Sequence, residues 1–164
     1  GATSPLAPRP SAATTLAGGF ASMVKFFPGA KAQTAALEEA LFAALLGAPH
    51  SDVQQVYDDQ YISSGGQLYE LMVGHDRFIA DLRPLLGAPG QSFSLCAHPY
   101  DLCTEVIARE AGVIVTDPFG RPLAAPLDTH TPVAWVGYAN ADLRDAIAPV
   151  LQRLLRERLG AHLG

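Results

Sequence analysis

The sequence has few cysteines, few charged residues and no long uninterrupted hydrophobic run. Its two cysteines, Cys96 and Cys103, are too few for the disulfide framework of a small secreted domain. No apolar stretch approaches the roughly 20 residues that a membrane-spanning helix requires, and no signal-peptide pattern is present. These absences favour reduced thiols and a cytoplasmic location, and they argue against a membrane partner.

Low charge also limits the possible partners. Charged residues make up 16% of the 164 residues and hydrophobic residues 49%, which is typical of a folded globular chain. The formal net charge is −5, whereas nucleic-acid-binding proteins concentrate positive charge. We therefore expect no nucleic-acid partner.

Cys96, His98 and Cys103 lie close together in the sequence, and such a group could indicate a metal site. A tetrahedral zinc site needs four ligands in a recognisable spacing, and no second pair occurs nearby. The prediction is that both cysteines are buried, reduced thiols.

The chain divides into an arm and one expected domain. Residues 1–15 are rich in Pro, Ala, Ser and Thr without periodicity, which predicts a linker or irregular arm. Residues 16–160 predict a single α/β domain, because strand-like and helical patterns alternate without an internal repeat. Strands are expected at 20–27, 52–62, 76–82, 113–117 and 133–138, and helices at 31–46, between 63 and 74, at 99–111 and at 142–159. The expected architecture is a layered α/β sandwich with a mixed, mostly buried sheet flanked by helices.

Residues 98–112 form the most clearly delimited segment. Pro99 suits the first position of a helix, and Gly112 suits its end. Asp101 falls in the first turn, where the helix dipole favours a negative charge, so it can be a helix-start residue and nothing more. Apolar residues at 102, 103, 106, 107 and 111 fall on one stripe, which predicts that this helix packs against something.

Three other features refine the expected helices. Ser63 is a candidate N-cap, and Gly65 and Gly66 either let a ligand or backbone approach closely or merely add flexibility. The pair at 38–39, two glutamates in a helix, is expected to face solvent. Asn140 is expected to cap the last helix, and Pro149 to kink or divide it.

Three stretches together resemble the C-terminal half of the inositol monophosphatase family. The first is Ser63 with Leu68 and Gly74, which resembles the family's Gly-Ser-x-Ala-Leu helix, although Ile62 replaces its glycine. The second is Pro-Tyr-Asp-Leu at 99–102, similar to the family's Pro-Trp-Asp-Ile, with Ala-Arg-Glu-Ala-Gly at 108–112. The third is Val-Thr-Asp at 115–117 with a following turn.

The resemblance implies a site that this chain only partly supplies. Asp101 would be a ligand of Mg²⁺, and Ser63, Ser64, Gly65 and Ser94 would lie beside the substrate. In the family, the other metal ligands belong to an N-terminal half with a Glu-Glu pair and an Asp-Pro-x-Asp-Gly-Thr loop. Neither motif occurs here in its expected context, so no complete catalytic set is present. The implied partner is that missing half or a second subunit, and a truncated domain is expected to expose an apolar face and form a homo-oligomer.

Two functions follow as hypotheses, and enzyme status stays open between them. In the first, the complete protein is a Mg²⁺-dependent phosphomonoesterase acting on a small sugar, cyclitol or nucleotide phosphate, and this chain alone is inactive. In the alternative, the chain is a degenerate, non-catalytic module for ligand binding or dimerisation. A third possibility is an unrelated α/β domain that shares a helix start by chance.

Overall fold

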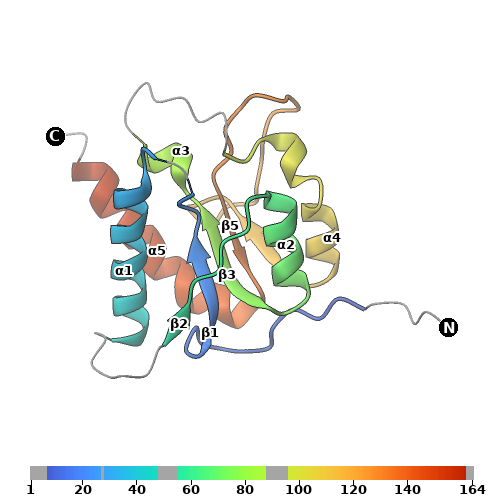
Figure 1. Cartoon of the computed structure of the whole chain (residues 1–164), viewed down its shortest axis with the longest axis horizontal. Coiled ribbons are helices and arrows are strands. Elements are labelled where there is room, and N and C mark those ends of the chain that lie inside the picture. Colours follow the sequence, from blue (N-terminus) through green and yellow to red (C-terminus); the bar gives the residue numbers. More distant parts are fainter. Residues whose placement is uncertain (1–6, 27, 48–54, 88–95, 162–164) are drawn as a thin grey trace.

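The computed structural model describes residues 7–26, 28–47, 55–87 and 96–161. They form an α/β protein in which a five-stranded mixed sheet is flanked by helices, and this confirms the expected fold class (Figure 1). The strands are β1 (Gly19–Met23), β2 (Val56–Tyr57), β3 (Asp76–Asp81), β4 (Ile114–Thr116) and β5 (Trp135–Tyr138). The helices are α1 (Lys31–Leu46), α2 (Ser64–Met72), α3 (Arg83–Leu86), the 3₁₀ helix η1 (Pro99–Leu102), α4 (Glu105–Glu110) and α5 (Ala141–Ala161).

The strands follow the order β2-β1-β3-β5-β4 across the sheet. β1 pairs in parallel with both β2 and β3, whereas β5 runs antiparallel to β3 and β4. All four residues of β5 are buried, as the continuous apolar run predicted. Because β1 and β3 are parallel neighbours, their carboxyl ends meet at one edge of the sheet.

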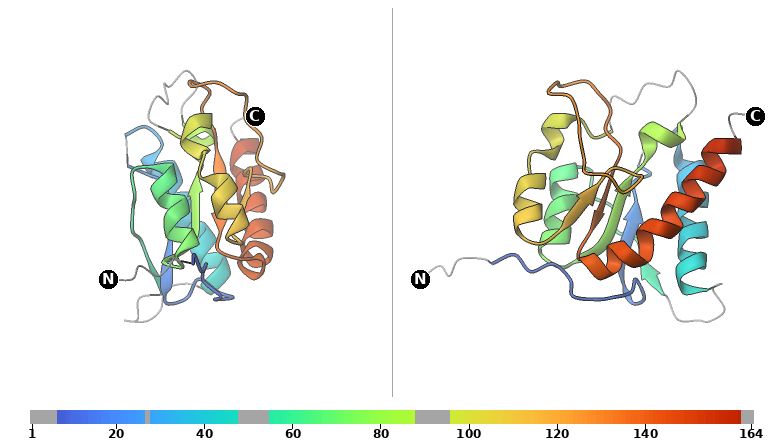
Figure 2. Two further views of the ribbon diagram at one scale, coloured as in Figure 1. Left: turned by 90° about the vertical axis from the view of Figure 1, so that its right-hand side faces the viewer. Right: turned by 180° about the vertical axis from the view of Figure 1, so that it is seen from behind.

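Helices cover both faces of the sheet. α1 and α5 pack against each other on one face, and α2 and α4 pack together on the other (Figure 2). In α5 the core side chains recur every four residues, so that one stripe of the helix faces the sheet. These side chains are Leu143, Ile147, Leu151 and Leu155, each at most 1% exposed. Asn140 caps α5 as expected, and Pro149 does not divide the helix.

The expected helix at 99–111 is broken in two, and most of its apolar stripe faces outward. Asp101 closes the first turn, a 3₁₀ turn, by accepting a hydrogen bond from the His98 N–H, and Cys103 and Thr104 form a turn between η1 and α4. The helix therefore restarts at Glu105 as α4. Leu102 is buried, but the other members that precede Gly112 are not: Cys103, Val106 and Ile107 are exposed, and Ala111 is half-buried. The segment packs against α2 and β4, as expected, but it does so through Leu102 and Ala108 and not through the whole stripe.

The residues described before β1, 7–18, form neither helix nor strand, but they are held against the body of the protein. The Asn140 side-chain amide donates to the backbone oxygens of Ser11 and Ala13, at 2.7 and 2.9 Å. The Arg77 guanidinium donates to those of Thr15 and Ala17. In the part of the chain that is described, no helix is long and apolar enough to cross a membrane.

Candidate functional site

Polar side chains and helix N-termini gather at the edge of the sheet where β1 and β3 end. α2 and η1 both begin at this edge (Figure 1). The chain leaves β1 toward α1 on one face. After β3 it first forms α3, which contacts α1, and then reaches η1 and α4 on the other face. α/β proteins commonly bind ligands beyond the carboxyl ends of their strands, where the chain passes to opposite faces of the sheet. This edge is therefore the candidate functional site.

The N-terminus of α2 forms one wall of the candidate site. The Ser63 hydroxyl accepts a hydrogen bond from the Gly66 N–H at 3.0 Å, which confirms the expected N-cap. The N–H groups of Ser64 and Gly65 lie in the first turn, where a helix offers no internal acceptor. A methyl group added at Gly65 would lie 3.7 Å from the Thr104 side chain, so the α2 backbone runs against the segment that follows η1. Ser63 is exposed and Ser64 is buried.

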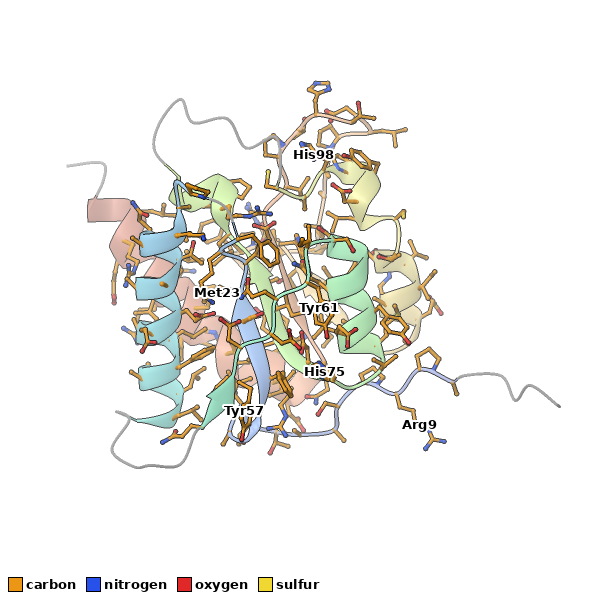
Figure 3. All side chains as sticks on the ribbon, in the orientation of Figure 1. Arg9, Met23, Tyr57, Tyr61, His75 and His98 are labelled. Carbon is orange, nitrogen blue, oxygen red and sulfur yellow. The ribbon has the colours of Figure 1, made fainter. Side chains whose placement is uncertain are left out.

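Asp101 lies in η1, beside the start of α2. Its Oδ2 accepts the His98 N–H at 2.9 Å and lies 3.5 Å from His98 Nδ1. The Asp101 side chain is 31% exposed, so the carboxylate is partly open to solvent while it closes the turn. His98, labelled in Figure 3, is buried, and its ring stacks on that of Tyr100 with ring centroids 5.7 Å apart. The fold thus brings Asp101 and the residues at 63–65 to the same edge, and Ser94 lies outside the described residues.

No family model matches this sequence, and no curated protein matches it. The likeness to inositol monophosphatases thus depends on the motifs alone. What the structure establishes is an α/β fold with a five-stranded mixed sheet between helices.

The donor groups near Asp101 do not make a complete magnesium site. Mg²⁺ prefers octahedral oxygen coordination and is usually held by one or two carboxylates together with substrate phosphate and water. Within residues 7–26, 28–47, 55–87 and 96–161, no three His, Cys, Asp or Glu side chains are grouped so as to hold a metal ion. Asp101 can supply one ligand, and further protein ligands would have to come from elsewhere.

A second polar network fixes the end of β1, and the sequence interpretation missed it. Glu38 was expected to face solvent, but it is 7% exposed, and its carboxylate accepts the Met23 N–H and lies 2.8 Å from Lys25 Nζ. Lys25 also contacts Asp58 at 2.7 Å. Burial raises the pKa of Glu38, and the hydrogen bond from Lys25 opposes this rise. Glu38 lies four residues before Phe42 and one after Leu37, so helical periodicity alone left its direction ambiguous.

Asp81 and Arg83 form a buried ion pair at the end of β3. The Arg83 Nε and Nη2 donate to the two Asp81 carboxylate oxygens at 2.9 and 2.7 Å. Burial and the negative charge of Asp81 raise the pKa of Cys96 to about 11, so this thiol is not a nucleophile at neutral pH. Cys96 is buried as predicted, whereas Cys103 is exposed, which corrects the second half of that prediction.

A third group of polar side chains lies at the opposite edge of the sheet, around His75 (Figure 3). His75 Nδ1 lies 2.9 Å from Asp76 Oδ1 and 3.6 Å from Glu70 Oε2. The imidazole stacks on Phe20 at 4.3 Å. Asp76 is 1% exposed, and its Oδ2 has no hydrogen-bond partner among the described residues. Burial raises the pKa of Asp76 to about 6. The signal in the sequence that could have pointed to this buried group is the position of Asp76, a carboxylate at the start of β3, a strand that is otherwise mostly buried.

Replacing Asp76 with asparagine is expected to stabilise the protein at pH 8 by about 1 kcal/mol. Because its pKa is raised in the folded state, Asp76 favours folding while protonated, below about pH 4, and this contribution is lost as the pH rises through about 6. Asparagine stays neutral at every pH, so the variant does not lose this stability as the pH rises. Urea denaturation between pH 4 and pH 8 measures the effect, with the exposed Asp145→Asn as the control. An unchanged pH dependence in Asp76→Asn would contradict the expectation.

Proposed function

We propose that this chain is the C-terminal α/β part of a Mg²⁺-dependent phosphomonoesterase similar to the inositol monophosphatases. The substrate class is a small sugar, cyclitol or nucleotide phosphate. The observation that carries the proposal is the position of the α2 N-terminus against the segment of Asp101 at the carboxyl edge of β1 and β3. On its own the chain has little or no activity, because Asp101 is one ligand of a site that needs more.

The chemistry of this edge suits an anion beside a cation. The unbonded N–H groups at the start of α2, aided by the helix dipole, are suited to phosphate oxygens. Gly65 lets the α2 backbone pack closely against Thr104, which places the start of α2 beside the segment of Asp101. Asp101 supplies a partly exposed carboxylate oxygen to a metal ion that would neutralise the phosphate. The described residues do not complete the metal site, so no reaction step is derived through the ion.

The test is a titration of backbone amide resonances with inorganic phosphate, in the presence and absence of Mg²⁺. We expect shifts at Ser64, Gly65 and Asp101 that grow when Mg²⁺ is present. Asp101→Asn is expected to abolish the Mg²⁺-dependent part and leave weak phosphate binding at α2. Asp142→Asn, an exposed aspartate in the first turn of α5, serves as the control and should change neither.

An activity assay tests the expected lack of catalysis separately from the expected binding of phosphate. The chain alone is expected to hydrolyse no phosphate monoester at a measurable rate with Mg²⁺. Robust hydrolysis by the isolated chain would contradict the assignment of Asp101 as a lone ligand. If added phosphate shifts amide resonances only in regions away from Ser64, Gly65 and Asp101, the assignment of this edge as the binding site is contradicted.

The second candidate is a non-catalytic module, and one observation favours it. Asp101 Oδ2 is already engaged by the His98 N–H, as in an ordinary helix-start carboxylate. In that case Mg²⁺ has no effect on the phosphate titration, and Asp101→Asn lowers stability without altering ligand binding.

A further inference from the structure

We propose that Glu70, His75 and Asp76 form a pH-sensitive contact that keeps residues 58–62 closed over the sheet at acidic pH and lets them open as the pH rises toward neutral. These residues, called here the 58–62 segment, follow β2 directly and lead to Ser63, the N-cap of α2. The proposal does not depend on the proposed phosphatase function, because it concerns the opposite edge of the sheet.

The His75 side chain touches four parts of the fold. Its imidazole stacks on the Phe20 ring of β1, with centroids 4.3 Å apart, and the Tyr61 ring lies edge-on to it at 6.4 Å (Figure 3). Its Nδ1 lies 2.9 Å from an Asp76 oxygen on β3 and 3.6 Å from a Glu70 oxygen on α2. The contacts of this one side chain therefore join β1, β3 and α2 to the chain that precedes α2.

Asp76 is the group whose negative charge the closed structure accommodates poorly. The residue is 1% exposed, and its Oδ2 accepts no hydrogen bond from any described residue. The neighbouring Arg77 gives no help, since its guanidinium donates to backbone oxygens of the N-terminal segment. Burial raises the pKa of Asp76 to about 6, although the hydrogen bond with His75 opposes the rise. Above that pH, a buried carboxylate carries a charge with one oxygen unpaired, which is costly.

The ionisable groups around Asp76 make this cost larger. Glu70 faces it from α2, and Asp59 faces it from the 58–62 segment, and the charge of each adds to the raised pKa of Asp76. The Tyr61 hydroxyl donates to Asp59 at 3.3 Å, and burial together with these carboxylates raises the Tyr61 pKa, so the phenol stays neutral. Among the described residues, His75 is the only basic side chain within ion-pair distance of Glu70 or Asp76. Three carboxylates thus share one imidazole once Asp76 is ionised.

The 58–62 segment is the part of this region that can move at the lowest cost. It forms neither helix nor strand, and hydrogen bonds with a side chain as one partner hold it to β1 and α2. Side chains that donate such bonds are Ser22, Gln60 and Gln67. Water can replace these bonds without breaking the ladder between β1 and β3. Opening the segment therefore hydrates Asp76 and leaves the rest of the fold in place.

The two states bind the Asp76 proton with different affinity, and this difference fixes the direction of the effect. The pKa is about 6 in the closed state, whereas a carboxyl group in water has a pKa of about 4. Protonation consequently favours the closed state, and the open fraction rises between about pH 4 and pH 6 and then levels off. The two-unit difference corresponds to a total rise of about a hundredfold, of which about tenfold falls between pH 5 and pH 8.

Thiol labelling at position 22 measures the opening. Ser22 is 4% exposed and its hydroxyl donates to the Asp59 backbone oxygen, so Ser22→Cys places a thiol under the closed segment. The variant also carries Cys103→Ser, because Cys103 is exposed. Each labelling rate is divided by the rate for the same chain unfolded in urea at the same pH, which cancels the ionisation of the thiol. We expect the open fraction to rise about tenfold from pH 5 to pH 8.

Two further substitutions in this background identify the titrating group. Asp76→Asn is expected to abolish the rise, whereas the exposed Asp145→Asn should keep it. Glu70→Gln removes one of the charges that raise the pKa of Asp76, so the rise should be smaller and centred at a lower pH. Because Glu70 is partly exposed at the surface of α2, this variant keeps the test informative if Asp76→Asn does not fold. An unchanged tenfold rise in both Asp76→Asn and Glu70→Gln would overturn the proposal.

The buried Cys96 distinguishes local opening from unfolding of the whole chain. It precedes η1 at the other edge of the sheet, so opening of the 58–62 segment leaves it covered. The thiol at position 22 is expected to react faster than Cys96, at a rate that 1 M urea does not change, because local opening exposes little surface. Equal reaction of the two thiols, with the same acceleration by urea, would assign the exposure to global unfolding and overturn the proposal. An open fraction that does not change with pH would overturn it too.

Discussion

Replacing Asp81 with alanine is expected to lower the free energy of unfolding by about 3–5 kcal/mol. Asp81 is 1% exposed, and the Arg83 side chain 9%, so the pair lies almost wholly out of water at the end of β3. The substitution removes the carboxylate that accepts hydrogen bonds from Arg83 Nε, Arg83 Nη2 and the Arg83 backbone N–H. Arg83 then keeps its charge in a largely buried position without this partner. Urea denaturation followed by circular dichroism measures the change.

The double variant Asp81→Ala/Arg83→Met separates the lost partner from the lost side chain. Methionine fills part of the space of arginine and carries no charge, so the double variant is expected to be more stable than Asp81→Ala alone. If the two variants lose the same stability, the loss of the Asp81 carboxylate beside the Arg83 charge is not the cause. Because Asp81 ends β3 and Arg83 begins α3, the pair also fixes how the chain leaves the sheet at the candidate site.

Replacing Asn140 with alanine is expected to cost about 2–3 kcal/mol, because one side chain serves two structures. Asn140 Oδ1 accepts the Leu143 N–H at 2.9 Å and caps α5. Asn140 Nδ2 donates to the oxygens of Ser11 and Ala13 and holds the N-terminal segment. Alanine removes all three hydrogen bonds. Thermal and urea denaturation measure the loss.

Asn140→Asp separates the role of this side chain in capping α5 from its role in holding the N-terminal segment. Aspartate keeps an acceptor for the Leu143 N–H and adds a charge that the helix dipole favours, so α5 is expected to stay intact. It places an oxygen opposite two carbonyl oxygens, so the segment at 7–13 should be released. Hydrogen exchange read by mass spectrometry should show loss of protection there and unchanged protection at 141–148. The Arg77 contacts should keep 15–17 in place. Equal loss of protection in both regions would contradict the division of roles.

Local signals were sufficient where one face of an element meets the core. Helix α1 was predicted with its observed bounds, because its alanine-rich apolar stripe and Gly47 leave little choice. Asn140 and Ser63 were recognised as caps, since an N-cap needs only a side-chain oxygen three residues before a helical N–H. The buried strand β5 followed from a run of apolar residues too short for a helix.

Local signals failed where a neighbour decides the outcome. Glu38 follows the polarity rule of a solvated face, yet Lys25 and the Met23 N–H make its burial favourable. The segment 99–111 has the pattern of a single helix, but the 3₁₀ turn closed by Asp101 and the turn at Cys103 and Thr104 interrupt it. Strand β2 is only two residues long, although 52–62 has a strand-like pattern, because its pairing with β1 covers only Val56 and Tyr57. In each case the deciding contact lies outside the local window or depends on a backbone geometry that periodicity does not report.

The candidate site shows the same division. The motifs singled out Asp101 and the residues at 63–65, and their common location at one edge could not be read from their separation in the sequence. The ion pair of Asp81 and Arg83 and the network of Lys25 carry no motif, since a charged residue at a strand end is usually exposed. These ion pairs stand out only because they are buried, and their burial depends on which helices cover each end of the sheet.

The sequence by itself determined the α/β class, the long helices and their caps, because these depend on periodicity, on glycine and proline and on single polar side chains. Only the tertiary structure decided which charged groups are buried in pairs and which polar groups meet at the edge proposed as the candidate site. It also decided that Val106 and Ile107 remain in solvent. The physical reason is that burial is a property of contacts between distant segments: the same apolar stripe faces a core or a partner depending on what lies opposite it.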